Sequence, residues 1–197
     1  NKKITRKITQ GVYALTTNNG GCIVDAVSQI SSGENPLISV AVMKSNNTHE
    51  LLKNNQTFAI SVLGKKVDPK IIETFGLNSM RYINKFEKIE TIEIENQKII
   101  KDSLGYMICE IIDTVENDTH TLFIGRLKEA DVIKEDEPMT YAYYQENKDE
   151  LIKVTTTKGQ TAWICTICGY IYYGEEIPED YTCPICGAEK IDFKIKN

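Results

Sequence analysis

Four of the chain's six cysteines form two closely spaced pairs near the C-terminus. In each pair two residues separate the cysteines, and a glycine follows the second one. This spacing lets both thiolates face one ion from a tight turn, and the glycine can adopt the positive φ that such a turn needs. The pattern therefore predicts a tetrahedral site of four thiolates. The pairs are Cys165 with Cys168, and Cys183 with Cys186.

Four sulfur ligands suit zinc or a single iron, and the spacing alone leaves both metals open. The aromatic side chains of the same segment favour iron, because an apolar shell around an iron–thiolate centre controls solvent access and hence its reduction potential. Aromatics also pack small zinc ribbons. A unit of this size, below about 40 residues, needs a metal to hold it together. The aromatics are Trp163, Tyr170, Tyr172, Tyr173, Tyr181 and Phe193.

The other two cysteines, Cys22 and Cys109, lie alone in apolar surroundings, so we expect them to be buried as small hydrophobic side chains. Paired cysteines without a secretion signal predict metal ligands in a reducing compartment, and we therefore expect a cytoplasmic protein. The chain begins at Asn1, which leaves its natural start open.

The composition excludes two classes of partner. The net charge of −5 provides no basic surface for nucleic acid. We expect no membrane span, since no apolar run reaches the roughly 18 residues that a span needs. The last 36 residues, from Ala162, hold six acidic and three basic side chains. This acidic unit either attracts a basic protein partner or is an ordinary solvated surface.

The first 150 or so residues consist mostly of predicted strands, rich in β-branched and aromatic residues and separated by polar turns. Two helices are expected, at 48–55 with Thr48 as N-cap, and at 68–77 opened by Asp68 and Pro69. Many short strands with few helices predict a closed antiparallel barrel. The predicted strands are 11–17, 22–31, 36–43, 57–63, 88–102, 103–116 and 120–134.

The change in composition predicts two domains. We place the first at 1–148, a linker at 149–161, and the metal-binding domain at 162–197. The polar stretch 145–162 marks the boundary, although its middle, 151–157, could still be ordered or form a strand.

The cysteine-containing segment resembles a rubredoxin domain, in the compact version found at the end of rubrerythrins. The resemblance rests on W-x-C-x-x-C-G-Y-x-Y-x-G followed by P-E-D-Y-x-C-P-x-C-G, and it covers Ala162 to about Lys196. It implies one iron bound by the four paired cysteines and cycling between Fe(II) and Fe(III). Such a centre carries one electron and has no open ligand position.

The preceding domain resembles the flavin reductase family of FMN-binding split barrels, over roughly Thr5 to Tyr144. The resemblance is carried by segments 24–63, 79–86, 117–127 and 138–144. It implies a mainly β fold, a split β-barrel of Greek-key type, with FMN as cofactor and NAD(P)H as hydride donor. It also implies homodimers with FMN near the interface. The chain has no G-x-G-x-x-G after a strand, so NAD(P)H would bind in the open cleft over FMN.

The same resemblance implies which residues hold the cofactor. Hydroxyls, backbone N–H groups and a lysine before the 48–55 helix would bind the phosphate. A strand with small side chains would line the flavin ring, and Lys85 and Ser79 belong to a loop resembling a lid. That loop departs from the family at Met80, Tyr82, Ile83 and Asn84, so its part in nicotinamide binding stays open. The implied contacts are Asp25, Ala26, Val27, Ser28, Ser31, Ser32, Lys44, Ser45, Asn46, Asn47, Thr48 and Lys85, with His120 near the flavin or nicotinamide.

Hydride passes directly from nicotinamide to flavin, so no catalytic acid, base or nucleophile is required. The whole chain resembles flavin reductase–rubredoxin fusions of anaerobes, which implies the electron order NAD(P)H, FMN, iron and then a flavodiiron protein that reduces O2 or NO. Two alternatives stay open: a flavin-binding barrel with a structural zinc ribbon that docks a protein, and a flavin reductase that releases reduced FMN. The sequence leaves the choice between NADH and NADPH, the final acceptor, and a separate NAD(P)H-oxidising enzyme undecided.

Overall fold

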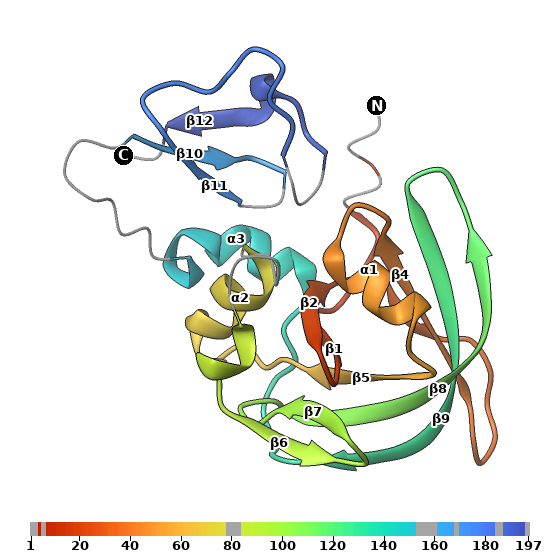
Figure 1. Ribbon diagram of the computed structural model, residues 1–197. Helices are drawn as coiled ribbons and strands as arrows, with labels where there is room; N and C mark the ends of the chain where they lie inside the picture. Colours follow the sequence, from red (N-terminus) through yellow and green to blue (C-terminus); the bar gives the residue numbers. More distant parts are fainter. Residues whose placement is uncertain are drawn as a thin grey trace.

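The computed structural model describes residues 4, 7–77, 84–152, 161–167, 170–183 and 187–195, apart from the side chain of residue 149. Figure 1 shows a large, strongly curved sheet with helices packed against it, and a small separate sheet near α2 and α3. The elements of the large domain are β1 (Tyr13–Thr17), β2 (Gly20–Val24), β3 (Val27–Gln29), β4 (Leu37–Met43), α1 (Asn47–Lys53), β5 (Thr57–Val62), α2 (Pro69–Gly76), η2 (Lys85–Glu87), β6 (Thr91–Ile94), β7 (Gln97–Ile100), β8 (Gly105–Glu116), β9 (His120–Val132) and α3 (Tyr141–Leu151).

Seven antiparallel strands form the main sheet in the order β2-β1-β5-β8-β9-β4-β3. β8 and β9 form a long hairpin with two register irregularities, and such bulges bend a sheet. The sheet curls into a half barrel, which confirms the predicted mainly β, split-barrel fold. The expectation of a closed barrel is wrong, because β2 and β3 end the sheet and no ladder joins them in the described residues.

The predicted strand over 22–31 is divided. β2 ends at Val24, and β3 begins at Val27 after a turn in which the Val27 N–H donates to the Asp25 carbonyl at 2.9 Å. Likewise, the run 88–102 contains the two-stranded hairpin β6–β7. Glu95 and Asn96 form its turn with φ values of 47° and 61°. Positive φ at both central residues is what a two-residue hairpin loop of type I′ requires.

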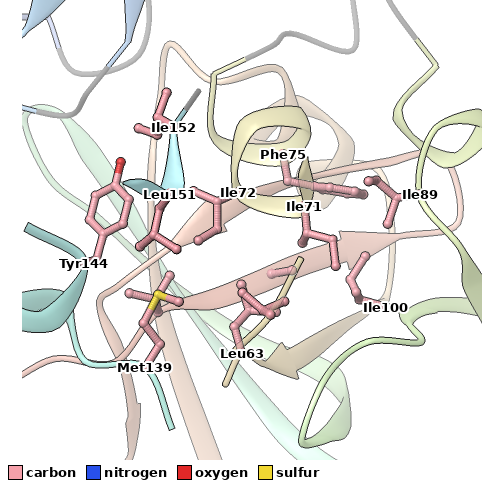
Figure 2. Packing of buried hydrophobic residues seen from close by; sticks show 13 residues of the cluster. Leu63, Ile71, Ile72, Phe75, Ile89, Ile100, Met139, Tyr144, Leu151 and Ile152 are labelled. Carbon is pink, nitrogen blue, oxygen red and sulfur yellow. The ribbon is translucent and has the colours of Figure 1, made fainter. Parts of the chain in front are cut away.

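The interior of the curled sheet holds two main apolar clusters. One includes Leu15, Phe58, Ile60 and Phe123 on the sheet itself. The other lies between the sheet and helices α2 and α3, where Ile72, Phe75, Met139 and Leu151 meet, as Figure 2 shows. Cys22 and Cys109 are 3% and 0% exposed, which confirms that they are buried as small hydrophobic side chains.

The two predicted helices are present, with one correction. Asn46, and not Thr48, caps α1: its Oδ1 accepts from the Thr48 N–H at 3.0 Å. For α2 the prediction is confirmed, since Asp68 accepts from the Lys70 N–H and Pro69 occupies the first turn. At this position proline loses no intrahelical hydrogen bond.

The sequence did not predict α3, which spans part of the segment read as polar boundary. The Thr140 hydroxyl caps it by accepting from the Tyr143 N–H at 3.1 Å. The helix continues to Leu151, past residue 148 where we had placed the end of the domain. Residues 153–160, most of the proposed linker, lie outside the described residues.

The C-terminal domain is a three-stranded sheet with the order β11-β10-β12. Its elements are β10 (Ala162–Cys165), β11 (Ile171–Tyr173), η3 (Lys190–Asp192) and β12 (Phe193–Ile195). It has a core of its own, formed by Cys165, Ile177, Cys183 and Phe193. Among the helices of the described residues, none is both long and apolar enough to cross a membrane.

Candidate cofactor sites

Two of the four predicted metal ligands, Cys165 and Cys183, lie in the described part of the C-terminal domain. Each begins a turn. The Cys165 N–H donates to the Tyr170 carbonyl at 2.8 Å, and the Gly187 N–H donates back to the Cys183 carbonyl at 2.9 Å. Gly187 has a φ of 70°, so it takes the left-handed conformation for which the sequence pattern required glycine. The described ends of both segments are therefore hydrogen-bonded as expected of cysteine knuckles.

The Cys165 and Cys183 side chains belong to one buried apolar cluster, with exposures of 0% and 3%. Aromatic side chains pack against this cluster, and the Tyr181 ring lies 4.7 Å from that of Tyr172 and 5.6 Å from that of Phe193. Two buried thiols in one such cluster fit a thiolate-bound metal. Cys168 and Cys186 lie outside the described residues. The described part alone contains no group of three or more candidate metal ligands.

The predicted phosphate-binding residues lie where β4 leads into α1. The Lys44 N–H donates to the Thr119 carbonyl at 2.9 Å, which joins this turn to the β8–β9 hairpin. Ser45 is exposed, and Asn46 and Asn47 are partly exposed. Thr48 is buried, so its hydroxyl faces the protein and not an open cleft. The turn thus offers some of the predicted polar groups at the surface, but not all of them.

The predicted positive charge at this turn is balanced by Glu116, a residue that the sequence did not single out. Its carboxylate lies 3.0 Å from the Lys44 ammonium and 2.9 Å from that of Lys53. Hydrogen bonds from Lys53 and Lys44 lower the pKa of Glu116 to about 2. An anion at Lys44 would have to share this lysine with Glu116. No sequence signal could reveal the pairing, because it joins parts of the chain some 60 to 70 residues apart.

The predicted ring-binding strand runs from the β2–β3 turn to the far end of β3. Burial raises the pKa of Asp25, opposed by backbone N–H groups and by nearby His120, so Asp25 and His120 lie in one region. Ser28 is exposed on β3, whereas the Ser31 Oγ accepts from the Leu37 N–H at 2.7 Å. Ser31 and Ser32 therefore lie at the opposite end of β3 from Asp25. Ala26 and Val27, both partly buried, lie at the near end.

The predicted lid residue Lys85 does not face solvent. It is 2% exposed, and its ammonium donates to the Gly21 carbonyl at 2.8 Å and to the Phe75 carbonyl at 3.1 Å. Burial lowers the pKa of Lys85 to about 8, while the nearby Cys22 opposes the shift. Lys85 thus holds η2 against β2 and α2. Ser79 and residues 80–83 of the same loop lie outside the described residues, so the role of this loop as a lid stays a prediction.

The two histidines occupy different environments. His120 opens β9 opposite Met43, and its Nδ1 lies 2.8 Å from the Thr119 hydroxyl. His49, 2% exposed, lies on α1 with its Nε2 2.8 Å from the Thr121 hydroxyl and its ring against Phe123. His120 is therefore the histidine near the predicted cofactor residues at the surface, and His49 joins α1 to the sheet.

Together, the region around Asp25, Lys44, Asn46 and His120 combines a carboxyl group, a lysine, an amide and a histidine where β4 meets the start of β9. Such a region can hold a phosphorylated, planar cofactor, because charged and hydrogen-bonding groups orient it while the sheet fixes its position. The second site, in the C-terminal domain, is chemically distinct, since its ligands are sulfur.

Comparison with known proteins agrees with both halves. Residues 5–151 match the flavin reductase like domain, and residues 163–194 match the rubrerythrin, rubredoxin-like domain. The high molecular weight rubredoxin of Moorella thermoacetica is 35% identical over 98% of both chains. A ferric-chelate reductase (NAD(P)H) of Archaeoglobus fulgidus is 31% identical over 70% of this chain and 85% of its own length.

Among solved structures, an NADH:FAD oxidoreductase of Streptomyces globisporus has a TM-score of 0.65 at 22% identity. The alignment covers 71% of this chain and 85% of that one. At this identity the likeness concerns the fold alone. The chain belongs to the flavin reductase like family and carries a rubredoxin-like domain at its C-terminal end.

Proposed function

We propose that this protein is an NAD(P)H-dependent flavin oxidoreductase whose C-terminal domain is a one-electron carrier. The observation that carries the proposal is the union, in one chain, of a flavin reductase half barrel with a domain that buries cysteine thiols in an aromatic shell. The relatives named high molecular weight rubredoxin and ferric-chelate reductase (NAD(P)H) support it, because both names describe electron transfer.

The chemistry explains why both parts belong together. A nicotinamide gives up two electrons at once as hydride, an iron–thiolate centre accepts one, and a flavin can exchange electrons in either way. The protein's task at the flavin is placement. The β2–β3 turn would line the ring, and the turn from Lys44 to Asn47 would hold the phosphate. We propose FMN as the flavin, since segments 24–63 and 117–127 resemble those of FMN-binding split barrels.

In the C-terminal domain, we propose iron as the metal, held by Cys165, Cys168, Cys183 and Cys186. The apolar shell of Tyr181, Phe193 and their neighbours supports iron, because exclusion of water tunes a redox centre. A metal saturated by four thiolates has no position for a substrate. The domain would therefore pass electrons to another protein, such as a flavodiiron oxygen or nitric oxide reductase.

Two further expectations belong to this proposal. The resemblance to the flavin reductase family implies a homodimer with the flavin near the interface. A cytoplasmic location suits the chemistry, because thiolate ligands persist in a reducing compartment.

The test is an anaerobic titration of the purified, metal-loaded protein with NADH and, separately, NADPH. Flavin and iron absorbance are followed together with metal content. We expect bound FMN to be reduced first, iron to bleach next, and one iron per chain. Stoichiometric zinc would instead support the docking alternative. Activity that needs added flavin would support release of reduced FMN, and reduction by neither nucleotide would mean that a separate enzyme supplies the electrons.

A further inference from the structure

The C-terminal end of α3 carries apolar side chains that do not contribute to capping the helix. Leu151 and Ile152 are 7% and 0% exposed, although they are the last residues before a polar segment. They join Tyr144 of α3 and Ile72 of α2 in one cluster, and Figure 2 shows Ile152 and Leu151 beside Ile72. We call this surface the α2–α3 patch. Apolar side chains at the end of a domain are buried only if another part of the protein covers them.

The C-terminal domain supplies part of that cover. Ile171 of β11 packs against the cluster that contains the α2–α3 patch. Tyr173, two residues further along the same strand, lies close enough to α2 for Glu73 to raise its pKa, after the larger effect of burial. Residues two apart on a strand face the same way. One face of β11 is therefore turned toward the flavin domain.

Tyr172 of β11, and Tyr170 just before the strand, belong to the C-terminal domain's own packing and not to the contact with the flavin domain. Tyr170 and Tyr172 pack into the C-terminal domain's own core, next to Cys165 and Cys183, whereas Ile171 is associated with the core of the other domain. The alternation separates two functions along one short strand. Tyr170 and Tyr172 contribute to the aromatic shell of the metal site, whereas Ile171 and Tyr173 face the flavin domain.

On the side of β12, no further strand among the described residues pairs with the small sheet. β11 and β12 are its two edge strands, with β10 between them. Next to β12 lies a groove of about 630 Å³, lined by Trp163, Tyr181 and Ile191 with acidic side chains Glu179, Asp180 and Glu189. Ile191 is 87% exposed. The Cys183 N–H donates to the Ala188 carbonyl beside this groove, so a metal ligand adjoins it.

We propose that this face of β11, through Ile171 and Tyr173, is the docking surface by which the C-terminal domain binds the α2–α3 patch of its own chain. In this bound state it takes up electrons, and its β12 edge remains free for an external acceptor. The electron-transfer part of this inference rests on the proposed function. One electron leaves the reduced flavin and converts ferric iron to ferrous iron, and no proton or group moves between the domains.

The experiment compares Ile171→Asp with Ile191→Asp in the full-length, cofactor-loaded protein. Both variants place the same charge in the same domain, but position 171 lies on β11 and position 191 lies in η3, at the groove next to β12. Hydrogen exchange of the Leu151 and Ile152 amides measures docking without any electron transfer. Flash reduction of the flavin, followed by the bleaching of iron, measures transfer. Iron content and visible spectrum show whether the C-terminal domain has folded.

We expect Ile171→Asp to accelerate exchange at the end of α3 and to slow iron reduction, each by roughly tenfold or more, because a buried carboxylate disfavours the contact. Neither measurement includes an external acceptor, so Ile191→Asp should leave both unchanged. The milder Ile171→Ala should shift both in the direction of Ile171→Asp. Unchanged exchange in Ile171→Asp would overturn the docking. Faster exchange with unchanged transfer would overturn its role in electron uptake.

The outcome is separable from the proposed function. If neither NADH nor NADPH reduces the flavin of the wild-type protein, the proposed function fails, while the exchange measurement and the flash experiment still test the docked arrangement. If nucleotides reduce the flavin but Ile171→Asp behaves as wild type, the proposed function stands and the docking inference falls.

Discussion

Lys85 shows how sequence can single out a residue without revealing its contacts. Resemblance to a family assigns it to a loop that resembles a lid over the flavin, and in the fold it is buried, with its ammonium donating to the carbonyls of Gly21 and Phe75. Those partners lie 64 and 10 residues away along the chain, so no local pattern could reveal them. By contrast, the glycine after Cys186 could be assigned a positive φ, because the requirement lies within one turn.

The buried ammonium predicts how stability depends on pH. The pKa of Lys85 is about 8 in the folded protein, compared with 10.5 for a lysine that is not buried, as in the unfolded chain. Between these pH values the unfolded chain binds a proton that the native protein does not, so the free energy of unfolding rises with pH. From pH 7 to pH 10 we expect the stability of the wild type to rise by about 2 kcal/mol relative to Lys85→Met, which does not titrate.

Urea unfolding at several pH values measures this difference. Lys88→Met is the matched control, since Lys88 belongs to the same turn and is exposed. The control should run parallel to the wild type over the whole range. A Lys85→Met curve that also runs parallel would show that Lys85 does not titrate between the two pH values.

At the scale of elements, the sequence located features whose signals are local. Most strands with strong β propensity, the turn at 18–21 and the Asp68-Pro69 helix start were predicted, whereas the Glu95-Asn96 turn of the β6–β7 hairpin was not. α3 was missed because its residues 145–150 are polar and its apolar contacts are widely spaced, at Tyr144 and Leu151. Its burial depends on α2 and the sheet, which only the tertiary structure provides. The open edge of the barrel was missed for a similar reason, since sheet closure is decided by strand pairs far apart in the chain.

The start of α2 provides a prediction at this scale. Asp68 caps the helix by accepting from the Lys70 N–H at 2.9 Å, and the helix carries Ile71, Ile72 and Phe75 into the core. Asp68→Ala should lower the free energy of unfolding by about 1 kcal/mol, because the N–H group loses its acceptor. Asp68→Asn keeps an acceptor oxygen and should lose much less. Chemical denaturation of the three proteins decides the matter, and equal losses in both variants would mean that charge, and not capping, is responsible.

The whole molecule combines a domain that can support itself with one that depends on its metal. The half barrel has large apolar clusters of its own, around Phe58 and Phe123 and around Phe75 and Met139. The described C-terminal domain is a three-stranded sheet with a four-residue buried core. A core of this size does not offset the conformational entropy of folding, so the metal must supply the difference. Stability is thus distributed unevenly between the parts that exchange electrons.

Removal of the metal should therefore unfold one domain and leave the other intact. Trp163 reports on this selectively, because it is the only tryptophan of the chain and lies on β10 with its Nε1 donating to the Gly174 carbonyl. In flavin-free protein treated with a chelator under reducing conditions, we expect the Trp163 emission maximum to shift to the red as the ring meets water. Far-UV circular dichroism should retain the signal of the half barrel, and added iron or zinc should reverse the shift.

Cys165→Ser should behave like the metal-free protein, since it lacks one of the four predicted ligands. An unshifted emission maximum after complete removal of the metal would contradict the dependence of the fold on the metal, because the aromatic shell would then be sufficient to hold the sheet together.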